Sequence, residues 1–180
     1  APLFHPAMKK VGPVRKDLAV KTFFNMLGPL VNPSFPKNQL TGVFNLELGR
    51  LYNYLFQKTN KNYTILYSLD GYDEISLTGI TKAYTQKKEI MLSPDSFKVS
   101  KVEFNQIQGG EDIISSVKIF MNVIQNKGTE AQQNVVCANA GMAISTALGL
   151  EPIDGFIRAK ESLQSGNALE SLKVLQKLSS

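Results

Sequence analysis

A strand, a helix and a second strand follow one another closely between residues 39 and 69, and this order restricts the fold more than any other feature. Residues 39–44 read QLTGVF, an apolar run typical of a buried strand. Residues 47–59 then carry apolar side chains at helical spacing, and residues 62–69 read NYTILYSL, rich in β-branched and aromatic residues. This order predicts a right-handed parallel crossover, the unit of an α/β sheet.

The second strand ends at an acidic segment, residues 70–74, which reads DGYDE. Ligands of α/β sheets usually bind beyond the carboxyl ends of the strands. Adjacent carboxylates at such an edge suit Mg²⁺, which prefers oxygen ligands and keeps several waters. A solvated acidic turn is the plain alternative, and the residues alone leave both interpretations open. The spacing excludes an EF-hand loop, and a chain with one histidine and one cysteine is a poor candidate for a zinc site.

The rest of the chain predicts further strands and then a helical C-terminal half. Residues 80–104 mix short β-like pieces with a Ser-Pro-Asp turn. A helix is expected to begin after Glu111 and Asp112, which place negative charge at its N-terminal end, and to end near Lys127. Three more helices are predicted over about residues 130–148, 153–164 and 167–177.

Charge is distributed unevenly along the chain. Residues 1–90 contain 12 Lys and Arg against 6 Asp and Glu, whereas residues 91–180 contain 8 against 9. A basic half suits nucleic acid, a membrane surface or anionic small substrates, and charge does not choose among them.

Three observations bear on the compartment. Cys137 is the single cysteine, which excludes an intrachain disulfide, and the opening APLFHPAMKK lacks the pattern of a secretory signal. Residues 131–150 are uncharged but contain several polar side chains and glycines, so they predict a buried helix and not a membrane span. We expect a soluble cytoplasmic protein.

Two N-terminal clusters are candidates for a binding site. His5 and Met8 lie close in sequence to Arg15, whose guanidinium can hold a carboxylate through two parallel hydrogen bonds. Gly28 before Pro29 leaves no side chain between the backbone and a flat ligand. From composition alone, a surface histidine and a helix stop followed by a turn are the simpler explanations.

Several motifs, taken in order, resemble those of the anthranilate phosphoribosyltransferases of tryptophan biosynthesis. They are HPAMK at 5–9, Arg15, TFFNMLGPLVNP at 22–33, GV at 42–43, DGYDE at 70–74 and CANAG at 137–141. The resemblance covers essentially the whole chain. It implies an α/β fold, the C-terminal part of a nucleoside phosphorylase/phosphoribosyltransferase-type domain, with a central, largely parallel sheet flanked by helices.

The resemblance also implies a reaction and a set of site residues. The family transfers a phosphoribosyl group from phosphoribosyl pyrophosphate to the amino nitrogen of anthranilate and releases pyrophosphate with Mg²⁺. Asp73 and Glu74 become the Mg²⁺ pair that faces the pyrophosphate, and no residue is assigned as a base because an arylamine is already nucleophilic near neutral pH. The residues placed around anthranilate are His5, Met8, Arg15, Gly28 and Pro29, with Arg15 on the carboxylate.

The sequence departs from the family in three respects. Members are nearly twice as long, with an N-terminal helical domain that forms the dimer, and they hold the donor with a GTGGD-type loop and a Lys-His-Gly-Asn segment. Tyr67 and Ser68 stand where many members carry His-Gly. We expect residues 1–180 to be the C-terminal portion of the domain, inactive by itself, and the full-length protein to be a homodimer.

Two other functions compete with this one. A transferase-inactive paralogue could bind nucleic acid through a basic surface, which the net charge of +5 permits. The intact His5, Arg15 and acidic pair argue against it, since a nucleic-acid module needs no aromatic-acid pocket. The same motifs argue against a pyrimidine nucleoside phosphorylase. We therefore expect neither a nucleic-acid partner nor a membrane partner.

Overall fold

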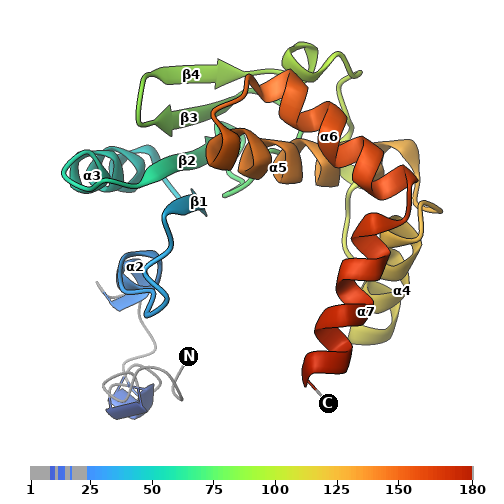
Figure 1. Ribbon diagram of the computed structural model, residues 1–180, viewed down its shortest axis with the longest axis horizontal. Helices are drawn as coiled ribbons and strands as arrows, with labels where there is room; N and C mark the ends of the chain where they lie inside the picture. The colour runs from blue at the N-terminus through green and yellow to red at the C-terminus, as the bar shows by residue number, and fades with distance from the viewer. Residues whose placement is uncertain (1–8, 11, 15–16, 18–23, 180) are drawn as a thin grey trace. The chain divides into compact units, whose positions relative to one another are not determined.

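The structure is a computed structural model that describes residues 9–10, 12–14, 17 and 24–179 (Figure 1). The chain divides into two compact units, residues 1–37 and residues 38–180. In the first unit, helix α2 (Phe24–Leu27) runs directly into a 3-10 turn (Gly28–Leu30), and the Val31 N–H donates to the Leu27 carbonyl at 3.1 Å. The helix stop expected at this point is therefore present.

The second unit contains a four-stranded mixed sheet in the order β1 (Asn38–Gly42), β2 (Asn62–Ser68), β3 (Thr81–Thr85) and β4 (Glu89–Leu92). β1 and β2 are parallel and joined through α3 (Leu46–Phe56), so the predicted crossover is confirmed. β2 with β3 and β3 with β4 are antiparallel. Neither of these connections contains an α-helix that would carry the chain back across the sheet, which is what a further parallel pairing requires.

Helix α3 covers one face of the sheet. Its N-cap is Asn45, whose side-chain oxygen accepts a hydrogen bond from the Leu48 N–H at 2.8 Å. Tyr52 and Phe56 lie one helical turn apart and are both buried. The Phe56 ring packs 5.4 Å from the ring of Tyr63 on β2. Of the apolar stripe seen in the sequence, Leu48, Tyr52 and Phe56 are buried, whereas Leu51 and Leu55 are exposed.

Helices α5 (Glu130–Leu148) and α6 (Pro152–Gln164) pack with the opposite side of the sheet in the main core. α5 begins at Thr129 with a reciprocal cap to Gln132 and ends at Gly149, whose φ of 70° favours glycine. These are the bounds that the sequence predicts, and helices on both faces confirm the α/β class. The buried core side chains include Leu66, Leu77, Ala83, Phe97, Cys137, Ala138, Met142 and Phe156.

α5 and α6 approach each other so closely that two positions have no room for a side chain. A Cβ at Gly141 would lie 2.5 Å from the Phe156 nitrogen, and one at Gly155 would lie 2.1 Å from the Gly141 carbonyl oxygen. Real Cβ atoms do not approach other atoms so closely, so the crossing depends on both glycines. Gly141 is the last residue of the CANAG motif.

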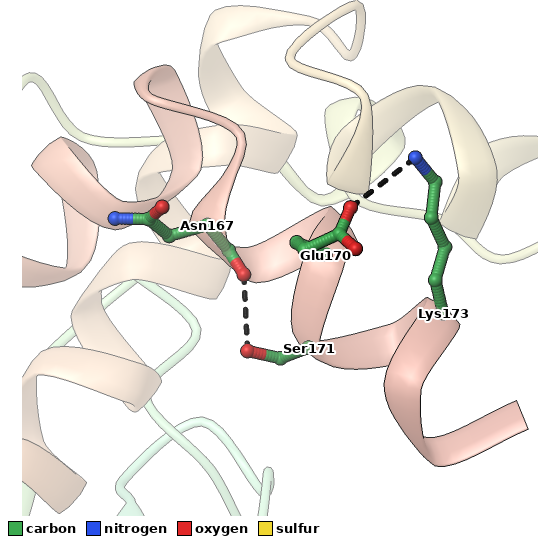
Figure 2. Close-up of polar contacts among 4 residues, drawn as sticks. All are labelled: Asn167, Glu170, Ser171 and Lys173. Atoms are coloured by element: carbon green, nitrogen blue, oxygen red, sulfur yellow. Dashed lines mark hydrogen bonds and ion pairs between the residues drawn. The ribbon is translucent and has the colours of Figure 1, made fainter. Parts of the chain in front are cut away.

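The two remaining helices lie mostly at the surface. α4 (Ile113–Ile124) begins at Asp112, whose carboxylate accepts from the Ser115 N–H at 2.7 Å, as the acidic start of the helix predicts. α7 (Asn167–Ser179) buries none of the side chains that the structure describes in it. Figure 2 shows its internal contacts, from the Ser171 hydroxyl to the Asn167 carbonyl at 3.0 Å and between Lys173 and Glu170 at 3.4 Å. Such exposed ion pairs contribute little to stability.

None of the helices among the described residues combines the length and the apolar composition needed to cross a bilayer.

Replacing Gly141 with alanine should destabilise the chain by about 1–3 kcal/mol, because the new methyl group forces α5 and α6 apart. The loss should appear even though alanine favours a helix over glycine by about 1 kcal/mol. The measurement is the urea midpoint of unfolding followed by circular dichroism. Gly109→Ala is the control, because a Cβ there meets nothing within 4 Å. Equal midpoints for the two variants would contradict the close crossing.

Candidate functional site

The acidic segment, residues 70–74, folds back on the end of β2. The Gly71 N–H donates to the Ser68 carbonyl at 2.9 Å, and the Ser68 N–H donates to the Tyr72 carbonyl at 2.9 Å. Gly71 has a φ of 103°, a conformation that side-chain-bearing residues rarely adopt, so glycine is required at this turn. The turn brings the two acids that follow it to the carboxyl edge of the sheet.

The three carboxylates of the segment play different structural parts. Asp70 faces its own loop, where its Oδ2 accepts a hydrogen bond from the Thr78 hydroxyl. A Cβ at Gly79 would lie 3.1 Å from the same oxygen, so the loop is closed tightly around Asp70. All three acids are exposed to solvent, and Asp70 differs from Asp73 and Glu74 in that its carboxylate is engaged by its own loop. Asp70 therefore holds the loop together, and the following pair is free to meet a ligand.

The carboxyl end of β1 touches the acidic segment at Gly42. A Cβ at this position would lie 1.6 Å from the Asp73 carbonyl oxygen, so the backbone of Asp73 occupies the space of a missing side chain. Gly42 pairs with Leu66 in the parallel register of β1 and β2. The acidic pair thus lies where both parallel strands end, which is the edge that the crossover predicts.

Two side chains from distant elements hold the peptide unit between Glu74 and Ile75. The Ser68 hydroxyl donates to the Glu74 carbonyl at 2.6 Å. The Ile75 N–H donates to Asn139 Oδ1 at 2.9 Å, and Asn139 Nδ2 donates back to the Ile75 carbonyl at 2.8 Å. Sequence analysis assigned no role to Ser68 or Asn139. The available signal was an amide within the uncharged stretch of residues 131–150, inside the CANAG motif.

The electrostatics of the pair suit a divalent cation. Partial burial raises the pKa of Glu74, and the neighbouring charge of Asp73 raises that pKa further. The two carboxylates are therefore close enough to repel each other, and a cation between them would relieve the repulsion. In the part of the chain that the structure describes, no cluster of three or more His, Cys, Asp or Glu side chains could hold a metal ion. Mg²⁺ fits such a site, because it commonly takes one or two carboxylates and completes its shell with water and phosphate oxygens.

The candidate acceptor residues lie in the first unit. His5, Met8 and Arg15 fall outside the described residues. Gly28 and Pro29 form the 3-10 turn after α2. A Cβ at Gly28 would meet no described atom within 4 Å, and its φ is not in the left-handed region, so neither crowding nor backbone conformation requires glycine there.

Comparison with known proteins identifies the family. Residues 1–169 match the family model described as glycosyl transferase family, a/b domain. The chain is 67% identical over 99% of its length to the anthranilate phosphoribosyltransferase of Flavobacterium psychrophilum, of which it covers 54%. The chain belongs to the anthranilate phosphoribosyltransferase family. It spans about half the length of the curated relatives it matches.

Solved structures of family members agree with this assignment. An anthranilate phosphoribosyltransferase from Saccharomyces cerevisiae in complex with PRPP and Mg superposes with a TM-score of 0.84 at 27% identity, covering 94% of this chain and 49% of that one. The same yeast protein in complex with 4-fluoroanthranilate gives a TM-score of 0.84 at 26% identity, with 94% and 50% covered. The expected phosphoribosyltransferase-type fold is therefore confirmed. None of these relatives carries a name that supports the nucleic-acid alternative.

The raised pKa of Glu74 predicts a pH-dependent effect of Glu74→Gln. The folded state favours the protonated acid, so ionisation of Glu74 lowers stability as the pH rises through its folded-state pKa. Glu74→Gln should therefore match the wild type near about pH 4 and exceed it near neutral pH, by less than about 1 kcal/mol because the side chain is exposed. Urea unfolding at the two pH values measures the difference.

Glu161→Gln removes one exposed carboxylate from α6 and is the control. A general effect of the substitution would change stability equally at both pH values. If the difference between Glu74→Gln and the wild type is the same at both, the repulsion between Asp73 and Glu74 is contradicted.

Proposed function

We propose that this chain is part of a protein that transfers phosphoribosyl from phosphoribosyl pyrophosphate to the amino group of anthranilate, releasing pyrophosphate in tryptophan biosynthesis. The observation that carries the proposal is the 67% identity, over 99% of the chain, to a relative named for that reaction. The acidic pair at the carboxyl edge of the parallel strands supports it, because a donor with a pyrophosphate group needs a cation at such an edge.

Each site residue has a part in the proposed reaction. Asp73 and Glu74 hold Mg²⁺, which supplies charge neutralisation for the departing pyrophosphate. Gly28 and Pro29, together with His5 and Met8, line the slot for anthranilate. Arg15 grips the anthranilate carboxylate and orients the amino group, so most of the rate acceleration comes from positioning and charge stabilisation.

The complete activity belongs to a protein of the relatives' length, because the segments that hold the donor in the family do not occur in these 180 residues. We expect that protein to be a homodimer without a nucleic-acid partner. A cytoplasmic location agrees with the single cysteine, Cys137, which is free and buried.

A chimera tests the proposal. Residues 1–180 replace the matching segment of the Flavobacterium psychrophilum relative, and formation of phosphoribosyl anthranilate is measured against the unaltered relative. We expect kcat/KM within about tenfold of the relative, since the exchange preserves the site residues. Asp73→Asn and Glu74→Gln in the chimera should lower kcat and raise the Mg²⁺ concentration for half-maximal rate, whereas Glu161→Gln should change neither. A folded chimera without activity would contradict the proposal.

Arg15→Ala in the same chimera should raise the KM for anthranilate by about 30-fold or more. The substitution removes a paired charge contact with the carboxylate, which typically contributes about 2–4 kcal/mol. Steady-state kinetics with anthranilate varied at saturating donor give the value. Lys10→Ala removes another basic side chain nearby in sequence and should leave KM within about twofold, as surface charges usually do. An unchanged KM for Arg15→Ala would reject the carboxylate role.

A further inference from the structure

We infer that Ser68 and Asn139 are positioning residues of the candidate metal site: they hold the Glu74–Ile75 peptide so that Asp73 and Glu74 face one divalent cation. The inference rests on the proposed function, because it takes these two acids as the protein ligands. It goes beyond that function in assigning the site's affinity partly to a serine in β2 and an asparagine in α5.

The peptide is held from both of its sides. The carbonyl of Glu74 and the N–H of Ile75 belong to one planar peptide unit and point in opposite directions. Ser68 occupies the carbonyl side at 2.6 Å, and Asn139 occupies the N–H side at 2.9 Å. Because the plane is held at both ends, the Cα of Glu74, which lies in that plane and carries the side chain, has a defined position. Ile75 is only 1% exposed, so water has little access to replace the contact with Asn139.

The proton positions on the serine side follow from counting donors. Ser68 has one hydroxyl proton, and that proton goes to the Glu74 carbonyl. The 2.5 Å contact between the hydroxyls of Ser68 and Thr81 must then have Thr81 as its donor. Both side chains are fully buried. A chain of hydrogen bonds therefore runs from β3 through β2 to the acidic segment, and each bond polarises the next.

The asparagine side is equally determined. Asn139 Nδ2 donates to the Ile75 carbonyl at 2.8 Å and to the Val135 carbonyl, one turn earlier on its own helix, at 2.9 Å. Its Oδ1 accepts from the Ile75 N–H, so the amide has one orientation that satisfies all three partners. Gly141, two residues further along α5, seats that helix directly on α6. The Asn139 amide therefore projects from a helix whose position is fixed by its packing against α6.

Rigid support of this kind affects how well two carboxylates bind a metal ion. A cation gains most when both oxygens already point at it, because ordering them on binding consumes binding energy. Without the cation, the carboxylates of Asp73 and Glu74 repel each other. If the hydrogen bonds from Ser68 and Asn139 were absent, the segment would let these two carboxylates move apart. Removing either side of the support should therefore weaken cation binding while the rest of the fold persists.

Binding of Mn²⁺, a paramagnetic stand-in for Mg²⁺, tests the inference on the 180-residue chain. Bound Mn²⁺ broadens the NMR signals of nearby amides, so a titration followed in ¹H–¹⁵N spectra reports local affinity without an activity assay. We expect the amides of residues 72–75 of the wild type to broaden first and to recover when Mg²⁺ is added in excess. The double variant Asp73→Asn with Glu74→Gln should lose this local effect.

Ser68→Ala and Asn139→Ala should each require about tenfold more Mn²⁺ for the same broadening, the lower end of the effect expected from loss of an outer-shell partner. Asn139→Ala should also speed hydrogen exchange of the Ile75 amide. Ser145→Ala is the matched control: its hydroxyl is buried on the same helix as Asn139 and donates to the Glu151 carbonyl at 3.0 Å. It should titrate as the wild type does.

The outcomes separate the inference from the function it rests on. Wild-type affinity in folded Ser68→Ala and Asn139→Ala overturns the positioning role and leaves the metal site standing. Absence of local broadening in the wild type overturns the metal site and the positioning role together. Should Asn139→Ala lose its dispersed spectrum, Ser68→Ala alone decides, because it removes only the two hydrogen bonds of the Ser68 hydroxyl and leaves the contacts of Asn139 in place.

Discussion

The pair of hydrogen bonds between the Asn139 amide and the Ile75 backbone is the contact on which the candidate site depends. It joins residues 64 positions apart in the chain and ties the helix layer to the loop at the sheet edge. The contact exists only while α5 is seated on the sheet, and α5 is seated through the core around Leu66 and Met142 and through its crossing with α6. Fold stability and site geometry are thus coupled through one helix.

The acidic segment shows how neighbouring carboxylates acquire different roles. All three acids are exposed to solvent, but the Asp70 carboxylate accepts a hydrogen bond from Thr78 within its own loop, whereas Asp73 and Glu74 follow each other directly in the chain. Gathering two like charges is unfavourable without a cation: partial burial raises the pKa of Glu74, and the charge of Asp73 raises that pKa further. The fold maintains the arrangement through contacts to the backbone of residues 73–75, made by Gly42 and by the side chains of Ser68 and Asn139. None of these contacts involves the carboxylates of Asp73 and Glu74.

Local patterns predicted most of the elements. The strand, helix, strand order between residues 39 and 69 is present, and α5 has the bounds that its uncharged sequence and flanking Thr129 and Gly149 indicate. The mixed character of the sheet was less accessible, because β3 and β4 are short and the antiparallel pairing of β3 with β2 depends on how the loop of residues 69–80 folds. The resemblance pointed to Asp73 and Glu74, but DGYDE alone does not show which of its three acids is engaged by its own loop.

The sequence by itself determined the family, the α/β class and the segment that carries the acidic pair, because periodicity, caps and short motifs are local properties of a chain. The tertiary structure alone decided which carboxylate is absorbed by its own loop, why glycine is required at positions 42 and 141, and which side chains hold the Glu74–Ile75 peptide. These facts depend on atoms brought within a few ångströms by packing of β1, β2, α5 and α6, and no local pattern encodes that proximity.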